Sequence, residues 1–529
     1  MAETQQFDLT RHGLDHTPLV RSAVLELEPP SLKDNTGLAE RFVSALKEAA
    51  ALKEVRFPVF LAGRLKDILL QSDFKAWAAF HVQADQGCLV DVRPVSRAGP
   101  VYGLAVDIGS TTLSFALLDL DIPQVIGEIS LTNPQVEYGE DVLTRARFAE
   151  HPDGLETLTA ALRRALNEGL AQICAAHGLK ADDILAAALA GNTIMTHFLL
   201  GIPVSTLIRE PYIPVINRPD NLTPSDLGLE IAPQAPVIVM PNKGSYFGGD
   251  LVAGLITAGF NRFDEPCFMV DVGTNAEVVL GQKDWLVGAA GAAGPALEGG
   301  VARMGIVAGP GAIDRVRIDR KTKAVTYRTL GGLPPRGICG SGLIDLFAEL
   351  FLSGLIDFRG KLTLPRDHER RMDLDDGPAF VVVPGNETAT GDPILLSEVE
   401  IDLLIRSKAA MYTILETILG SMGLKIDRIN RFFVAGTFGQ YIDPRMAVAV
   451  GMLPDIPLER YVALGNSSLK GLILILFSSQ ARAEVLDIWN RLTYLELNVN
   501  QDFMNRFSAA RFIPHTYREL FPSVGTKIK

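Results

Sequence analysis

Two segments of the sequence place an aspartate at the end of an apolar run, directly before a glycine-containing turn. The first reads Asp-Ile-Gly-Ser-Thr-Thr from Asp107, and the second reads Asp-Val-Gly-Thr-Asn from Asp271. An apolar run follows each turn, so both segments predict a strand, a tight turn and a second strand. Backbone amides and hydroxyls of such turns can bind phosphate, and an aspartate at the strand end can hold Mg²⁺, usually through water. The predicted phosphate-binding residues are Gly109, Ser110, Thr111, Thr112, Gly273, Thr274 and Asn275.

The repetition of this pattern decides how it is interpreted. A single copy is more often an ordinary hairpin. Two copies in the same context favour one nucleoside polyphosphate bound by both turns, with Asp107 and Asp271 positioning its Mg²⁺ ion. A Walker loop is excluded, because no Gly-x-x-x-x-Gly-Lys-[Ser/Thr] pattern occurs and a strand, not a helix, follows each turn.

A third glycine-containing segment could receive the nucleoside of the same ligand. An apolar run leads into Gly436, Thr437, Phe438 and Gly439, where the missing glycine side chains would let a nucleoside lie against the backbone. The alternative is an ordinary junction between a strand and a helix. Lys408, in the middle of a predicted helix, could lean over an adenine, although a helical lysine is more often solvated.

Asp250 is the candidate for orienting a water molecule. It follows two glycines at the start of a predicted helix, where a carboxylate could direct water for in-line attack on a γ-phosphate. The alternative is that Asp250 only caps the helix. Turns at 190–193 and 294–299 also combine glycine with a polar group and could face the ligand, but such turns are common. His197 follows an apolar helix face and is interpreted as a packed histidine.

The composition limits the classes of protein to which the chain can belong. With 529 residues the chain needs more than one core, so roughly two to four domains are expected. A net charge of −12 argues against non-specific nucleic-acid binding. The polar start argues against a signal peptide, and the longest apolar stretch, Leu469–Phe477, is too short to span a bilayer. These features predict a cytoplasmic protein.

The cysteines offer little chemistry of their own. They occur singly and without a Cys-x-x-Cys pair, at Cys88, Cys174, Cys267 and Cys339. A disulfide framework, a zinc site or an iron–sulfur cluster built by this chain is therefore not expected. We expect small buried residues at these positions.

Three regions can be distinguished along the chain. Residues 1–35 are polar and contain prolines, which is typical of an extended linker, and residues 36–97 predict a small α+β middle domain. Residues 98–529 alternate between strand and helix patterns, which favours a layered α/β fold. A phosphate hairpin in each of the segments 98–245 and 246–529 predicts two lobes, as a gene duplication would produce.

Individual elements follow from the apolar patterns. The strands expected in the third region are 102–107, 112–119, 184–190, 236–241, 267–272, 276–280 and 431–435. The first two regions are expected to contain an edge strand at 20–27, a helix at 38–51, a strand at 59–61, another helix, and a strand at 88–92. Ser397 to Glu400 predict a capping box before a helix at 398–420, and residues 361–392 predict a surface excursion.

The three glycine-containing segments resemble the phosphate-1, phosphate-2 and adenosine motifs of the ASKHA superfamily, which contains acetate and sugar kinases, Hsp70 and actin. The segment Gly249–Ala253 resembles the one in which the sugar kinases carry a catalytic aspartate. The resemblance implies a duplicated, actin-like or sugar-kinase-like (ribonuclease H-like) ATPase core. It assigns the catalytic roles to Asp250, Asp107 and Asp271, and the metal to the last two.

A narrower resemblance covers nearly the whole chain. Several segments are similar to the reductive activators of corrinoid proteins, namely 16–21, 29–34, 133–142, 191–197, 292–299, 337–342, 435–439 and 451–454. This family uses ATP hydrolysis to drive an electron onto the Co(II) corrinoid of a methyl-transfer partner, which restores Co(I). The resemblance implies ATP, Mg²⁺, a corrinoid-protein partner and a homodimer formed through the ASKHA domain.

The sequence also departs from the family pattern. The family carries an N-terminal ferredoxin domain with a four-cysteine [2Fe–2S] site, and no segment here resembles it. Either that domain is missing from this sequence or the electron arrives from a separate donor protein. Ala290-Gly291 stand where the family has Ser-Cys, and Leu472 stands where a small residue is usual.

Three other classes of function remain open at this point. A small-molecule kinase of the ASKHA type would transfer phosphate to a substrate. An activator of 2-hydroxyacyl-CoA dehydratases would need a cluster bridged by paired cysteines, which the sequence does not offer. A nucleotide-gated binding module would bind ATP and a partner without a redox consequence.

Overall fold

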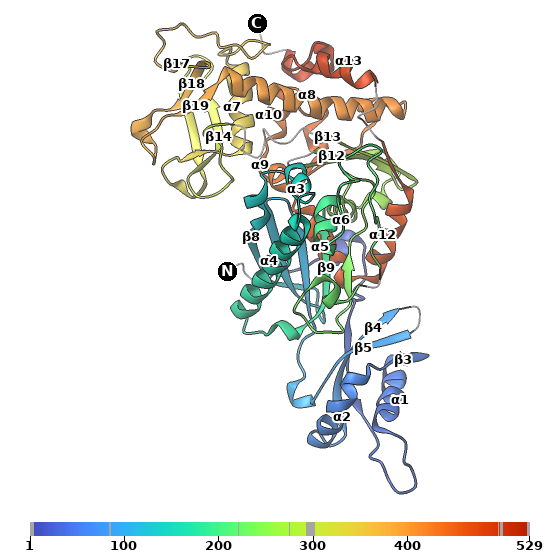
Figure 1. The fold of residues 1–529 in the computed structure, drawn as a ribbon. Helices are drawn as coiled ribbons and strands as arrows, with labels where there is room; N and C mark the ends of the chain where they lie inside the picture. Colours follow the sequence, from blue (N-terminus) through green and yellow to red (C-terminus); the bar gives the residue numbers. More distant parts are fainter. Residues whose placement is uncertain are drawn as a thin grey trace. The chain divides into compact units, whose positions relative to one another are not determined.

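The computed structural model describes residues 5–83, 86–220, 222–273, 276–291, 302–495, 497 and 501–525. The chain forms two compact units (Figure 1). The first consists of Met1–Gly259 and Ser467–Asn490, and the second of Phe260–Asn466 and Arg491–Lys529.

The main sheet of the first unit has six described strands. In order across the sheet they are β1 (Gln5–Gln6), β8 (Gln124–Thr132), β7 (Thr112–Asp119), β6 (Tyr102–Ile108), β9 (Ile184–Gly191) and β10 (Val237–Val239). Strands β6, β7 and β8 are antiparallel neighbours, whereas β9 runs parallel to β6 and β10 parallel to β9. Every residue of β9 is buried, as expected for a central parallel strand covered on both faces.

The helices around this sheet are α3 (Val142–Phe148), α4 (Gly154–Ala176), α5 (Thr193–Leu200), α6 (Gly249–Ala258), α11 (Ser467–Phe477) and α12 (Ser479–Arg491). Of these, α4, α5, α6 and α11 contact its strands. Helix α4 packs on β7 and β8, and α11 packs on β6 and β9. Helix α11 belongs to this unit although it lies far along the chain. It packs closely on α6. A side chain at Gly471 would collide with the carbonyl of Ala253, so the glycine permits the close approach.

A small module near the N-terminus has its own core within the first unit. Its sheet has the order β2 (Arg21–Glu26), β4 (Lys75–Gln83), β5 (Gln86–Arg93) and β3 (Glu54–Arg56), with helices α1 (Leu38–Ala50) and α2 (Val59–Gln71). The predicted edge strand at 20–27 and strand at 88–92 are confirmed. The strand predicted at 59–61 is wrong. These residues begin α2 after Pro58, because Leu61, Leu65 and Leu69 recur at helical spacing and are buried together.

The main sheet of the second unit repeats the arrangement of the first. Its described strands are β21 (Tyr461–Gly465), β20 (Arg431–Ala435), β11 (Cys267–Val272), β12 (Ala276–Gln282), β13 (Trp285–Gly291) and β22 (Leu492–Tyr494). The order β13-β12-β11-β20-β21 matches β8-β7-β6-β9-β10, with the same parallel and antiparallel pairings around β11 as around β6. The predicted α/β fold with a duplicated core is confirmed.

Two three-stranded sheets and several helices complete the second unit. The strands are β14 (Ala312–Ile318), β15 (Val325–Thr329), β16 (Gly337–Ile338), β17 (Arg371–Leu374), β18 (Gly377–Val383) and β19 (Ile394–Ser397). The helices are α7 (Gly340–Leu352), α8 (Glu398–Ser421), α9 (Gly436–Tyr441), α10 (Pro444–Ala449), α13 (Gln501–Ala510) and α14 (Pro522–Gly525). In Figure 1, α13 (red) lies along α8 (orange), and the two helices are in contact.

Two sequence predictions in this unit have different outcomes. The capping box is confirmed, because the Ser397 hydroxyl accepts from the Glu400 amide at 3.3 Å and the Glu400 carboxylate accepts from the Ser397 amide at 2.7 Å. The prediction that 361–392 is a surface excursion is wrong only for residues 379–383. These residues of β18 are buried, and Phe380, Val382 and Val383 join the core beneath α8 because the apolar run of the strand packs inward, although charged residues before it hide the strand pattern.

Candidate nucleotide-binding residues

Asp107 lies at the carboxyl end of β6 in the first unit. Its neighbours in the sheet are Ser114 on β7 and Ala190 on β9. The hydroxyl of Ser468, at the start of α11, donates to Asp107 Oδ1 at 2.7 Å. The half-buried carboxylate is therefore oriented by a helix that begins at the same edge of the sheet. No local pattern could indicate this contact, because Ser468 is 361 residues from Asp107 in the chain.

Asp250 interacts electrostatically with Asp107. It stands in the first turn of α6, whose N-cap is Gly248, so the alternative that Asp250 caps the helix is wrong. Its Oδ1 accepts from the Leu251 amide at 2.8 Å. Burial, with a further contribution from the negative charge of Asp107, raises the pKa of Asp250 to about 7. A carboxyl group with such a pKa can exchange a proton near neutral pH.

Close backbone contact places the start of α6 beside the predicted turn at 190–193. A Cβ at Gly248 would lie 2.8 Å from the Gly191 carbonyl oxygen and would overlap the Asn192 backbone. A Cβ at Gly109 would lie 2.6 Å from the Thr112 carbonyl oxygen. Glycine is therefore required by close packing at both positions, one beside Asp250 and one in the predicted phosphate turn.

Asp271 occupies the matching position in the second unit. It lies opposite Glu277 on β12 and Ala435 on β20. The residue after Ala435 is Gly436, whose φ of 78° favours glycine. A Cβ at Gly436 would lie 2.8 Å from Asp271 Oδ1. The structure therefore brings the predicted metal-binding aspartate of this unit together with the first glycine of the predicted adenosine segment.

The remaining predicted residues of the second unit have mixed outcomes. Thr274 and Asn275 lie outside the described residues, as does the turn at 294–299. Thr437 and Phe438 belong to α9, which begins directly after β20. Gly439 packs against the end of β20, where an added Cβ would lie 2.5 Å from the carbonyl oxygen of Val434.

Lys408 is placed where it anchors the chain. Its side chain is 0% exposed, and its ammonium group donates to the carbonyls of Phe512 at 2.5 Å and Pro514 at 2.6 Å. Burial lowers the pKa of Lys408 well below its usual range. This placement fixes the C-terminal segment and gives no support to a contact with adenine. His197 is a packed histidine as predicted, fully buried with Nδ1 2.7 Å from the Thr193 carbonyl oxygen.

The donor groups of the chain fit some cofactors better than others. Asp107 and Asp271 carry carboxylate oxygens, the type of ligand that Mg²⁺ prefers. No cluster of three or more His, Cys, Asp or Glu side chains that could hold a metal occurs in the described part of the chain. The cysteines do not fit a [2Fe–2S] cluster, because they do not gather in a group of three or more possible ligands in the described residues, and burial raises the pKa values of Cys174 and Cys267 to about 11. Across the described ranges, the helices are too short or too polar to cross a membrane.

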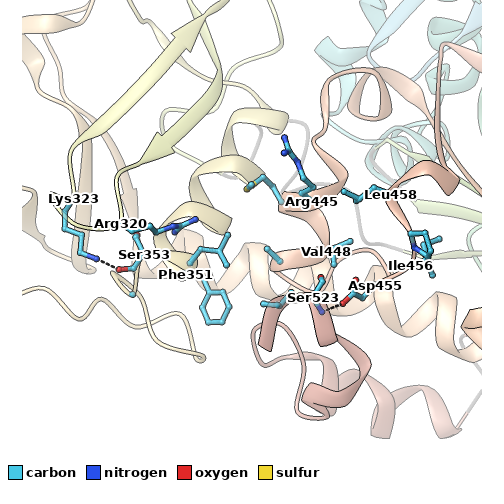
Figure 2. Close-up of a pocket in the computed structure, with 16 residues that line it drawn as sticks. Arg320, Lys323, Phe351, Ser353, Arg445, Val448, Asp455, Ile456, Leu458 and Ser523 are labelled. Carbon is cyan, nitrogen blue, oxygen red and sulfur yellow. Dashed lines mark hydrogen bonds between the residues drawn. The ribbon is translucent and has the colours of Figure 1, made fainter. Parts of the chain in front are cut away.

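The second unit also contains a cavity of about 1030 Å³, shown in Figure 2. Basic side chains, those of Arg320, Lys323 and Arg445, and apolar ones such as Val448 and Ile456 line it. None of the predicted nucleotide-binding residues that the structure describes lines this cavity.

Comparisons with known proteins identify the family. The RACo linker region matches residues 10–98, the RACo middle region residues 102–263, and the C-terminal domain of RACo, the ASKHA domain, residues 265–525. The solved structure of a reductive activator for corrinoid, iron–sulfur protein has 39% identity and a TM-score of 0.89, covering 96% of this chain and 81% of that one. The chain belongs to the RACo family. The resemblance noted in the sequence is thereby confirmed.

Two curated relatives support the same assignment to a family. The corrinoid activation enzyme RamQ of Eubacterium limosum is 30% identical over 442 residues, which are 82% of this chain and 74% of RamQ. A [Co(II) methylated amine-specific corrinoid protein] reductase of Methanosarcina barkeri is 22% identical over 436 residues, 77% of this chain and 76% of the reductase. The RACo middle region corresponds to residues 102–263, and residues 36–97 lie within the RACo linker region.

Proposed function

We propose that this chain is an ATP-dependent reductive activator, which returns the Co(II) corrinoid of a methyl-transfer protein to Co(I). The observation that carries this proposal is the match over 96% of the chain, at 39% identity, to a reductive activator of known structure. The names of the two curated relatives point to the same substrate class, a corrinoid protein.

The residues of each unit have proposed roles in this reaction. Asp107 and Asp271 position the Mg²⁺ of bound ATP, and the turns that follow them bind its phosphates. Asp250 orients the attacking water, a role supported by its neighbour Asp107 and its pKa of about 7. The segment from Gly436 to Gly439 binds the adenosine. Bound MgATP supplies the free energy of its hydrolysis, which makes ATP hydrolysis the proposed enzymatic activity.

The electron must come from a redox donor, because the residues described above hold no redox group. One electron leaves a donor, either a separate protein or a ferredoxin-type domain with a [2Fe–2S] cluster, and reduces Co(II) to Co(I). Separately, water and ATP give ADP and phosphate. We propose that the nucleotide state changes the affinity for the corrinoid protein, which couples the two reactions. A cytoplasmic location and a homodimer complete the proposal.

The test follows the absorbance change from Co(II) to Co(I) of a corrinoid protein from the same methyl-transfer system. The full chain is supplied with an external reductant and a ferredoxin-type donor, with and without ATP. We expect Co(I) to accumulate only with ATP, and not with a non-hydrolysable analogue. Equal Co(I) formation without ATP would contradict the proposal, and phosphate appearing on a small molecule would support a kinase instead.

A further inference from the structure

Three consecutive carbonyl groups of the turn after β6 are bound by two neighbouring elements of the first unit. Asn133 Nδ2 donates to the Gly109 carbonyl at 2.9 Å, and the Asn133 amide donates to the Thr111 carbonyl at 2.8 Å. Arg145 Nη1 donates to the Ser110 carbonyl at 2.5 Å. Asn133 precedes a short 3₁₀ helix and Arg145 lies in α3, so two separate elements hold three consecutive carbonyls.

These contacts determine where the amides of the turn point. In a trans peptide the carbonyl of one residue and the amide of the next point in opposite directions, and the peptides of this turn are trans. Because the carbonyls of Gly109, Ser110 and Thr111 point to the Asn133–Arg145 side, the amides of Ser110, Thr111 and Thr112 point away from it. Three successive amides directed to one side form a cradle for an anion.

Arg145 adds a buried positive charge behind this cradle. Its side chain is 0% exposed and also donates to the carbonyls of Gly139 at 2.8 Å and Glu140 at 3.4 Å. These acceptors are neutral, so they orient the guanidinium without cancelling its charge. Burial lowers the pKa of Arg145 to about 10, with Asp141 partly opposing the shift, so the group stays charged at neutral pH. A charge away from water acts strongly on an anion nearby.

We propose that Asn133 and Arg145 are positioning residues for triphosphate binding. They hold the carbonyls of the 109–112 turn so that its amides face the phosphates, and the Arg145 guanidinium strengthens the attraction. This inference rests on the proposed function, because it requires that the turn binds the phosphates of ATP. It extends that proposal to two residues that do not touch the ligand.

The chain offers a matched control for Arg145. Arg163, in α4 of the same unit, also donates to backbone carbonyls, those of Leu199 at 3.0 Å and Asp226 at 2.8 Å. Neither acceptor belongs to the phosphate turn. R145M and R163M therefore each remove a guanidinium group that donates to backbone carbonyls. Only R145M should change the affinity for the phosphates of ATP.

The experiment measures the dissociation constants of ATP and AMP for the full-length protein and both variants by calorimetry, with melting temperatures recorded for each. We expect R145M to weaken ATP binding about tenfold or more while AMP binding changes about twofold or less. R145K, which keeps the charge but not the geometry, should lie between R145M and the wild type. R163M should leave the ratio of the two affinities unchanged even where it lowers the melting temperature.

Two results would overturn the inference: an unchanged ratio of ATP to AMP affinity in R145M, or an equal change in R163M. If R145M does not fold, N133S tests the same inference, because it should also weaken ATP binding more than AMP binding. Serine can still accept from the Gln135 amide, which Asn133 Oδ1 accepts at 3.0 Å, but it loses the Gly109 contact. A wild-type protein that binds no ATP would instead overturn the proposed function.

Discussion

The hairpins of the two units have the same strand arrangement but different surroundings. Asp107 lies near the end of the central strand β6, opposite Ala190 on the parallel strand β9, and Asp271 lies near the end of β11, opposite Ala435 on β20. Each central strand also has an antiparallel neighbour, β7 or β12. The duplicated sheet therefore places two carboxylates in equivalent positions.

The contacts of the two carboxylates differ. Asp107 accepts from the Ser468 hydroxyl and adds to the burial that raises the pKa of Asp250, and Asp271 packs against Gly436, where a side chain would collide with it. A hydroxyl and a second carboxyl group thus act on Asp107, and the missing side chain of Gly436 leaves room beside Asp271. We infer that the two hairpins supply equivalent carboxylates, to which the first unit adds Asp250 and the second adds the space beside Gly436.

The largest effects are expected when either equivalent carboxylate is neutralised. D107N and D271N should each lower the rate of ATP hydrolysis about 100-fold or more, because each removes a charge that positions Mg²⁺. Phosphate release at saturating MgATP measures this loss. D119N is the control, since Asp119 lies at the opposite end of β7, paired with Tyr102. A rate in either variant within about threefold of the wild type would break the equivalence of the hairpins.

A second prediction concerns Asp250, for which the second hairpin has no predicted counterpart. D250N should lower the rate constant of hydrolysis about 100-fold with little change in ATP affinity, as for loss of a general base. The wild-type rate should fall as the pH drops through the Asp250 pKa of about 7, because the protonated group cannot accept a proton. Excess Mg²⁺ beside Asp107 should move this fall to lower pH. Unimpaired hydrolysis by D250N would show that the assigned role is wrong.

A third prediction separates space from backbone strain in the second unit. G436A should weaken ATP binding about tenfold and cost about 1–2 kcal/mol of stability, because its Cβ would meet Asp271 and its φ is positive. G423A is the matched control. Gly423 also has a positive φ, of 62°, but a Cβ there would meet nothing within 4 Å. Equal ATP affinity in G436A and G423A would show that the space between Gly436 and Asp271 does not contribute to ATP binding.

The smallest effect is expected from the hydroxyl that orients Asp107. S468A removes one hydrogen bond to a carboxylate and should raise the Mg²⁺ concentration for half-maximal hydrolysis about threefold to tenfold. S467A is the neighbouring control, because the buried Ser467 hydroxyl makes no hydrogen bond within the described residues. If both variants shift the Mg²⁺ dependence alike, the contact with Asp107 has no specific role.

The sequence predicted the elements that carry the hairpins because their patterns are local. The strand predicted at 112–119 is β7 and the one at 431–435 is β20, each an apolar run bounded by a turn or glycine. The family and its ASKHA core were also recognisable from these segments. Val59–Leu61 was misinterpreted because three apolar residues cannot distinguish a strand from the first turn of a helix.

The groups that act on the predicted site residues were harder to find. Ser468 and Arg145 meet the Asp107 hairpin only through tertiary folding, and neither residue type signals such a contact. For Lys408 the sequence allowed too much. Its position in a helix was compatible with a contact to the ligand, but its burial against Phe512 and Pro514 does not support that contact. Sequence patterns therefore indicated which backbone turns matter, but not which side chains orient them.

We propose that both hairpins bind the same nucleotide. Equilibrium binding of MgATP to the purified protein, repeated with D107N and D271N, tests it most directly. We predict one ATP per chain, with both substitutions weakening that same binding event. Two ATP per chain, with each substitution abolishing one of them, would contradict the account.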